Sequence, residues 1–310
     1  MEKTALPPGC YAMGITPFKR NGDLDEGALR AHIQWLNDAN VGFWPASPAT
    51  GEASLMSDAE VFRTWEITVD VVAGKIPVVA GSREFPTARE NLAFASEAKR
   101  LGLDAIQLYP LTMGHSFIPS AAMLESFYHQ VLSDVEIPVV LSSNISTGFE
   151  VPASILDKQV EDHSSVIGVF KHHTDQQNVA EFVARFSPRT TVLTMTQRHM
   201  FAFAVGSSGE LDNLQNIAPR LCRSLHDALQ NQDQAAAAQS YRRIVELWAG
   251  IQQFSAEFSA PRVVIYKAIL RILGGAGGWA RTPYQDLSDD AVSALRRMVA
   301  AVGLREIEGV

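Results

Sequence analysis

Eight short apolar runs, spaced about 28 residues apart, constrain the fold of this chain more than any other feature of its sequence. The runs are rich in β-branched residues, apolar throughout rather than alternating with polar residues, and bounded by Gly or Pro. Strands that are buried on both faces, as in an all-parallel sheet, have this pattern. The runs begin at Tyr11, Gly42, Pro77, Asp104, Pro138, Val166, Thr191 and Gly209.

Amphipathic helices are predicted between these runs. Residues 25–39 place Leu29, Ile33 and Leu36 on one stripe, and Ser57 with Glu60 has the spacing of a capping box. Gly102 is a stop signal for the helix that begins at Thr87. Further helices are expected over 121–133, 152–161, 176–186, 220–231, 233–254, 261–273 and 289–302.

A strand followed by a helix, repeated eight times, predicts an α/β fold that closes as a (β/α)₈ TIM barrel. A doubly wound open sheet is the alternative. From about Pro219 the pattern changes to helices only. We therefore expect the barrel to occupy residues 1–218, and residues 219–310 to form a C-terminal helical appendage that includes any final barrel helix.

Composition excludes several classes of partner. The formal net charge is −8, so no basic surplus exists to neutralise nucleic acid or an anionic membrane. No signal peptide and no apolar run of about 20 residues is found, which favours a cytoplasmic protein. Cys10 and Cys222 are the only cysteines and lack metal-ligand spacing, so neither a disulfide nor a metal site is predicted. No cofactor is implied.

Lys171 closes the sixth apolar run, VIGVFK. Active sites of such barrels lie at the C-terminal ends of the strands. Apolar surroundings disfavour an ammonium ion and lower its pKa, and a neutral amine can attack a carbonyl to form an imine. We therefore expect Lys171 to be a catalytic nucleophile, although a lysine that snorkels at the barrel rim would give the same pattern.

The turn Pro48–Glu52 follows the second run and contains the sequence ATGE. Exposed backbone N–H groups and a threonine hydroxyl can bind a carboxylate. This places Ala49, Thr50 and Gly51 among the candidate substrate-binding residues. The pattern is short, and an ordinary turn would also fit it.

The order of several motifs resembles the dihydrodipicolinate synthase and N-acetylneuraminate lyase family of Schiff-base, class I aldolases. The resemblance covers most of the chain. Its motifs are GITPF with NGDLD behind it, ATGE, IPVVAGS, LGLDAIQLYP, IPVVLSS, VIGVFK, VGSSGELDN, and KAILRILG followed by RTPY.

The resemblance implies that Lys171 forms an imine with pyruvate or a related 2-oxo acid. It also implies that Thr50 and Gly51 hold the substrate carboxylate. Family members are typically tetrameric, so a homo-tetramer or dimer is expected here.

Several residues depart from the family pattern. Ala49 replaces a hydroxyl residue before the threonine of the turn. Ser142, with Ser143 next to it, replaces a proton-shuttling tyrosine at the end of the fifth strand. The arginine that binds a second carboxylate in dihydrodipicolinate synthase is missing from SSNISTG. A serine hydroxyl is far less acidic than a phenol. Genuine dihydrodipicolinate synthase activity is therefore not expected.

Other residues are candidates for the missing roles. Strand alternation puts His173 on the same side as Lys171, so we expect His173 in the barrel as a general acid–base and His172 toward the helices. Arg83 and Arg198 are candidates for a second anionic group of the substrate. Glu210, in the eighth run, is a further candidate for substrate binding.

The leading hypothesis is a lyase that forms an imine with a 2-oxo acid, for aldol cleavage, condensation, or dehydration of a 2-keto-3-deoxy sugar acid. The alternative is a catalytically divergent protein that binds a 2-oxo acid or sugar acid on the same fold. A metal-dependent barrel enzyme has little support, because no Asp, Glu and His cluster falls on successive strand ends.

Overall fold

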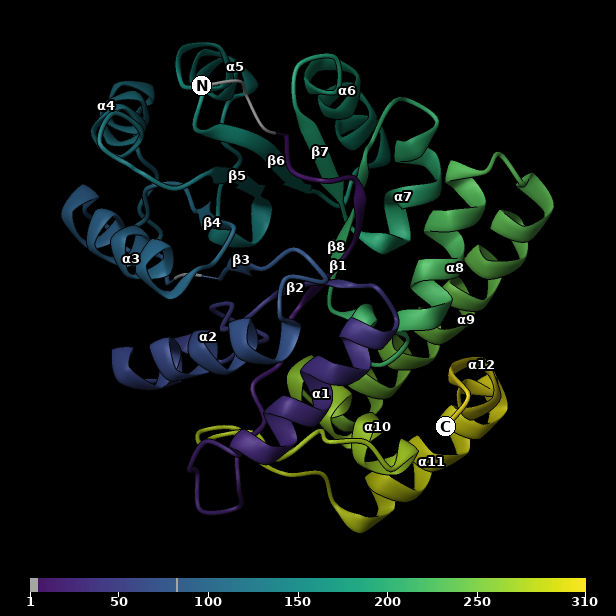
Figure 1. The fold of residues 1–310 in the computed structure, drawn as a ribbon. Helices are drawn as coiled ribbons and strands as arrows, with labels where there is room; N and C mark the ends of the chain where they lie inside the picture. The colour runs from purple at the N-terminus through teal and green to yellow at the C-terminus, as the bar shows by residue number, and fades with distance from the viewer. Residues whose placement is uncertain (1–4, 82) are drawn as a thin grey trace. The chain divides into compact units, whose positions relative to one another are not determined.

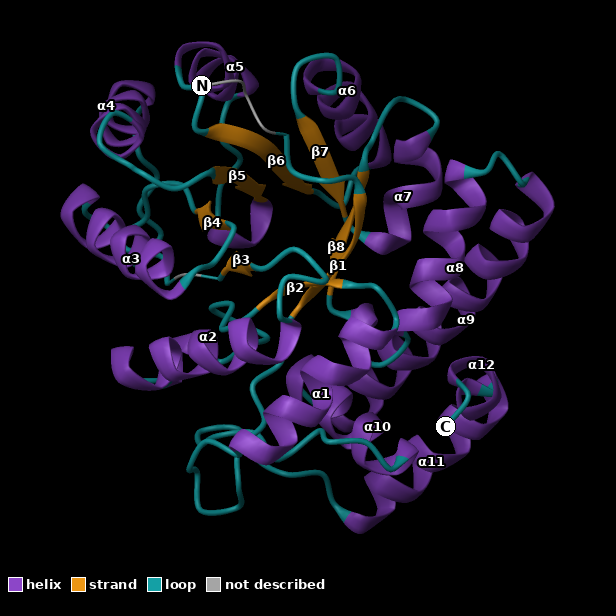
Figure 2. Ribbon diagram, in the orientation of Figure 1, coloured by secondary structure: helices purple, strands orange, loops and turns teal. Residues whose placement is uncertain are grey.

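The computed structural model describes residues 5–81 and 83–310. Within them, eight strands run in parallel and helices connect them, which makes the fold a (β/α)₈ TIM barrel with additional C-terminal helices (Figures 1 and 2). The predicted fold class is confirmed. The strands are β1 (Gly9–Met13), β2 (Gly42–Trp44), β3 (Val79–Ala80), β4 (Ala105–Leu108), β5 (Val139–Asn144), β6 (Val166–His172), β7 (Thr191–Thr194) and β8 (Gly209–Asp212).

The helices begin and end close to the predicted positions. They are α1 (Glu26–Asp38), α2 (Asp58–Val72), α3 (Ala88–Leu101), α4 (Ala121–Leu132), α5 (Ala153–Asp162), α6 (Gln176–Phe186), α7 (Thr196–Phe203), α8 (Pro219–Gln230), α9 (Gln234–Phe258), α10 (Arg262–Leu273), α11 (Asp289–Val302) and α12 (Leu304–Glu308). The sequence did not predict α7 or α12.

Local signals explain the helix ends. Ser57 and Glu60 form the predicted capping box at the start of α2. Gly102 ends α3 with a φ of +87°, a left-handed conformation that glycine adopts without steric cost. Asp25, Thr87 and Ser120 each accept a hydrogen bond from a backbone N–H in the first turn of their helices.

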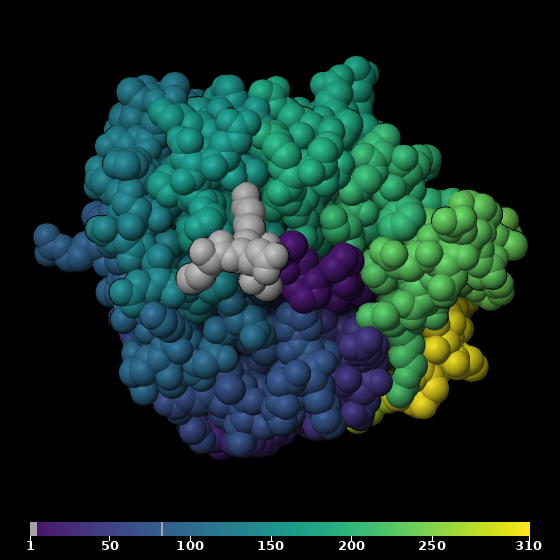
Figure 3. All heavy atoms as spheres, turned by 45° about the horizontal axis from the view of Figure 1, so that its top comes forward, coloured from purple at the N-terminus to yellow at the C-terminus, as the bar shows by residue number. Residues whose placement is uncertain are grey.

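The chain divides into two compact units, and the predicted boundary at residue 218 stays a prediction. One unit contains residues up to Gly9 and Pro77–Leu211, with strands β3 to β8. In this unit Leu6 connects the N-terminal segment to the beginnings of β6 and β7 by hydrogen bonds. Its N–H donates to Ile167 O at 3.1 Å, and its carbonyl accepts from Thr191 Oγ1 at 2.7 Å. Figure 3 shows the described N-terminal segment in dark purple.

The other unit contains Cys10–Ile76 and Asp212–Val310. Here β1 pairs with β2 in parallel, with Tyr11 opposite Gly42. A Cβ atom on Gly42 would lie 2.3 Å from the Tyr11 ring, so only glycine fits. Helices α8 and α9 pack against each other in this unit (Figure 1). Within the described ranges, none of the helices combines the length and apolarity needed to cross a membrane.

Candidate active site

The side chain of Lys171 lies on the side of β6 that faces helix α6. It is 1% exposed, and its Nζ lies 4.8 Å from the centre of the Phe182 ring on α6. The same nitrogen forms an ion pair with Glu150, which precedes α5. We expected this side chain to point into the barrel, and that expectation was wrong. The role of Lys171 as a nucleophile stays untested.

Charge and burial act in opposite directions on this ion pair. Burial lowers the pKa of Lys171, and the hydrogen bond and charge of Glu150 partly oppose this effect. Burial raises the pKa of Glu150, but hydrogen bonds from Lys171 and Asn178 outweigh it, so the net shift of the Glu150 pKa is downward. Lys171 is therefore held by a carboxylate in the helix layer.

His173 lies on the same side as Lys171, as strand alternation predicted, but that side is not the barrel interior. Its Nε2 is 3.8 Å from Glu150 Oε2, and its Nδ1 accepts a hydrogen bond from Asp175 N at 3.0 Å. The expectation that His173 points into the barrel, with His172 toward the helices, is reversed.

The residues that flank Lys171 face the barrel interior. Because successive side chains on a strand point to opposite faces, Phe170 and His172 lie on the face away from α6. In the ladder between β5 and β6, Phe170 is opposite Ser142 and His172 is opposite Asn144. Phe170 and Ser142 are both 0% exposed. The interior face at the end of β6 therefore carries a phenyl ring and an imidazole.

Asn144 fixes the hydrogen-bonding state of His172. Asn144 Oδ1 accepts from Ser146 N at 2.9 Å, which identifies this atom as the amide oxygen. His172 Nδ1 lies 2.8 Å from the same oxygen and must donate to it. In the neutral imidazole Nε2 is then the atom that can accept a proton.

The two serines at the end of β5 lie on different faces. Ser142 shares the interior face with Phe170, whereas Ser143 is opposite Lys171 and faces the helices. Neither hydroxyl has a hydrogen-bond partner among the described residues. Of the two, Ser142 is the one that a ligand in the barrel interior can reach.

Hydrogen bonds within the protein hold the Thr50–Gly51 turn. They already use some of the groups that were predicted to bind the substrate carboxylate. Gly51 N donates to Ser47 Oγ at 3.0 Å, and Gly51 O accepts from Thr16 Oγ1 at 2.7 Å. A Cβ atom on Gly51 would lie 2.3 Å from Ser47 N, which explains the glycine. Ala49 is exposed and Thr50 is half-buried. The Gly51 amide is thus committed to Ser47, and a carboxylate would have to use Thr50.

A buried ion pair behind this turn was missed by the sequence analysis. Glu52 and Lys267 are both 0% exposed and form an ion pair. Glu52 Oε1 also accepts from Arg281 N at 2.8 Å, and Lys267 donates to Trp279 O at 2.9 Å. Burial lowers the pKa of Lys267 to about 8, although Glu52 opposes the shift. The only signal in the sequence was a lysine inside an apolar helical run.

The remaining candidates lie on three different segments of the fold. Arg83 follows β3 and is half-buried. Arg198 Nη2 donates to Thr174 O at 2.6 Å, in the loop before α6. Thr194 of β7 pairs with Lys171 of β6 on one side and with Glu210 of β8 on the other. Glu210 therefore faces the helices, as Lys171 does. Across the described part of the chain, no group of three or more His, Cys, Asp or Glu residues could hold a metal ion.

Comparisons with known proteins place these features in a family. The model of the dihydrodipicolinate synthetase family matches residues 7–302. The chain is 27% identical over 290 residues to an uncharacterized DapA-like lyase of Rhizobium meliloti, with 93% of each protein covered. It is 29% identical over 294 residues to the 4-hydroxy-tetrahydrodipicolinate synthase of Methanopyrus kandleri, with 94% of each covered.

Solved structures agree on the fold. A dihydrodipicolinate synthase from Aquifex aeolicus superposes with a TM-score of 0.84 at 22% identity, covering 96% of this chain and 98% of that one. An N-acetylneuraminate lyase from Mycoplasma synoviae superposes with a TM-score of 0.80 at 18% identity, covering 94% and 96%. The chain belongs to the dihydrodipicolinate synthetase family, whose members are lyases of the class I aldolase type.

Proposed function

We propose that this family member acts on a 2-oxo acid in the barrel interior, that His172 rather than His173 moves the proton, and that Lys171 forms no imine. Family membership supports a 2-oxo acid as the class of substrate. The observation that carries the proposal is the orientation of β6, with Phe170 and His172 on the interior face and Lys171 against α6.

This arrangement disfavours an imine at Lys171. A carbonyl carbon must approach Nζ to form the C–N bond, and the space around Nζ is occupied by the Phe182 ring and the Glu150 carboxylate. A lysine that carries its proton in an ion pair is also not a nucleophile. Imine formation would require α6 to move away from the strand.

His172 can instead act as a general base. Because Nδ1 donates to Asn144, Nε2 is the unprotonated nitrogen of the neutral ring and can take a proton from the carbon next to the substrate carbonyl. The electron pair of the broken C–H bond forms the carbon–carbon double bond, and the carbonyl pair moves to oxygen. The Ser142 hydroxyl, on the same face, can donate a hydrogen bond to that oxygen.

Deuterium exchange into the methyl group of pyruvate, followed by NMR in D₂O, tests this role. We expect His172→Phe to slow exchange at least about 100-fold, a typical loss for a general base. His173→Phe is the matched control on the helix side and should leave the rate within about twofold. Equal losses in the two variants would contradict the assignment.

Borohydride reduction in the presence of pyruvate tests the imine route through Lys171. We expect no pyruvate adduct on Lys171 by mass spectrometry, and the same result for Lys171→Ala. An adduct that is present in the unmodified protein and lost in Lys171→Ala would restore the imine mechanism and overturn the proposal.

A second candidate function is binding of a 2-oxo acid or sugar acid without turnover. Phe170 favours it, because the interior end of β6 then lacks an amine that could serve as an electron sink. Thermal stabilisation by pyruvate, with neither methyl exchange nor cleavage of any keto acid, would favour this function. Exchange that depends on His172 would exclude it.

We further propose a homo-tetramer or dimer in the cytoplasm. The family resemblance supports the assembly, and two buried cysteines that form no disulfide in the described residues are compatible with a reducing compartment. Multi-angle light scattering of the purified protein measures the assembly. A monomer over the micromolar range would contradict it.

A further inference from the structure

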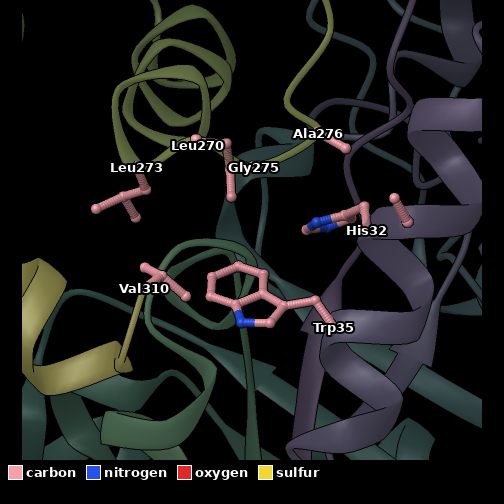
Figure 4. Close-up of a pocket in the computed structure, with 9 residues that line it drawn as sticks. His32, Trp35, Leu270, Leu273, Gly275, Ala276 and Val310 are labelled. Atoms are coloured by element: carbon pink, nitrogen blue, oxygen red, sulfur yellow. The ribbon is translucent and has the colours of Figure 1, made fainter.

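A cavity of about 400 Å³ lies beside α1, outside the barrel interior. Its volume is within the usual range for small-molecule sites. Figure 4 shows the His32 and Trp35 side chains of α1 reaching into this space. The other walls are Ala31, Leu270, Leu273, Gly274, Gly275, Ala276 and Val310. None of the lining side chains is acidic or is that of Lys or Arg, so the lining offers no cationic side chain to an anionic ligand.

His32 presents a defined acceptor next to this cavity. It is 1% exposed, and its Nε2 lies 3.0 Å from Asn216 Oδ1. That oxygen also accepts from Ile15 N at 3.1 Å, so it cannot be the amide nitrogen. Nε2 must therefore carry the proton, and Nδ1 is an acceptor.

This acceptor has no protein partner. His32 Nδ1 and Trp35 Nε1 are both buried without a hydrogen-bond partner among the described residues. Burial lowers the pKa of His32 to about 4, so the ring is neutral at physiological pH. A buried acceptor without a partner costs free energy that a suitable ligand can recover.

We propose that this cavity binds a small neutral molecule with an apolar ring and one hydroxyl group, which donates to His32 Nδ1. The aliphatic wall and the Trp35 ring enclose the apolar part. Residues 274–276 of the wall carry no side chain larger than a methyl group, which leaves space in the cavity for the hydroxyl. The site is separate from the proposed 2-oxo acid function and does not depend on it.

Isothermal titration with three probes tests the proposal: benzyl alcohol, toluene and benzoate. We expect benzyl alcohol to bind roughly fivefold more tightly than toluene, the value of one net hydrogen bond, and benzoate not to bind. Tighter binding of benzoate, or equal binding of alcohol and toluene, would overturn the assignment of the ligand class.

Two variants locate the site. His32→Phe keeps an aromatic ring and should abolish the preference for the alcohol over toluene. Ala31→Phe, at an exposed position of α1, fills the cavity from its rim and should abolish binding of both. Alcohol binding that survives Ala31→Phe would place the ligand elsewhere and overturn the proposal. Circular dichroism checks that both variants fold.

Discussion

The Nζ atom of Lys171 lies 4.8 Å from the centre of the Phe182 ring, on the side of β6 that α6 covers. This contact gives the lysine a packing role between a strand and a helix, with Glu150 as its counter-ion. The residue just before it, Phe170, takes the interior position opposite Ser142.

Substitution of Lys171 should reveal this packing role in stability. Lys171→Ala removes the buried stem and leaves a cavity against Phe182, so we expect a loss of about 2 to 3 kcal/mol in the free energy of unfolding. Lys171→Met keeps the stem and leaves Glu150, which is 37% exposed and can be hydrated, so the loss should be about 1 kcal/mol or less. Urea unfolding measures both. Equal losses would show that stability depends on the charge of Lys171 and not on the packing of its aliphatic stem.

An amine introduced at the interior position should be able to form an imine with a 2-oxo acid. Phe170→Lys places the amine on the barrel face of β6, opposite Ser142. We expect borohydride to trap a pyruvate adduct at residue 170, and the adduct to persist in the double variant with Lys171→Met. Phe170→Met is the control and should give none. Failure of a folded Phe170→Lys variant to trap pyruvate would argue against a 2-oxo acid site beside this position.

The Glu52–Lys267 pair should be strongly coupled because both side chains are fully buried. Lys267→Met leaves a buried carboxylate without its partner, and we expect a loss of about 3 to 5 kcal/mol in unfolding free energy. In the double variant with Glu52→Gln, the loss should be well below the sum of the two single losses. A double-mutant cycle by urea unfolding provides the measurement, and additive losses would rule out the coupling.

His32 should make stability fall as pH decreases. Its folded-state pKa is lowered to about 4, whereas the unfolded value is about 6.5. Between these values the unfolded chain takes up a proton that the folded chain does not, so stability is lost on going from pH 6.5 to 4, by about 3 kcal/mol at most. His32→Phe should flatten urea-derived stability in this window. Parallel pH profiles for the two proteins would contradict the assignment.

The barrel could be predicted from the sequence because its signals are repeated and local. Each of the eight predicted runs overlaps a strand of the structure, and the capping box at Ser57 and the stop at Gly102 are both present. Helix α7 was missed because it is short and follows β7 without a linker of recognisable turn residues.

The face of Lys171 could not be predicted for a physical reason. A strand buried on both sides is apolar throughout, so VIGVF lacks the alternation that separates an inner from an outer face. A shift of one residue exchanges the two faces completely. The alternation rule therefore paired Lys171 with His173 correctly but could not say which side they shared.

The partners of the turn Pro48–Glu52 were also beyond the sequence. The Gly51 amide donates a hydrogen bond to Ser47, and Glu52 forms an ion pair with Lys267, which is more than 200 residues away in the sequence. Neither contact follows from spacing, because each depends on where the folded chain brings a side chain. The TGE pattern identified the turn, but not which of its donors are already used.

The position of Lys171 along β6 has a consequence for the classification of relatives of this protein. Two chains can have near-identical strands and the same number of lysines, yet differ in whether they can attach a substrate covalently. They differ in whether the lysine occupies an odd or an even position along the strand, and therefore in which face of the strand carries it. A classification that asks only whether a lysine ends this strand will not separate proteins that can attach a substrate covalently from those that cannot.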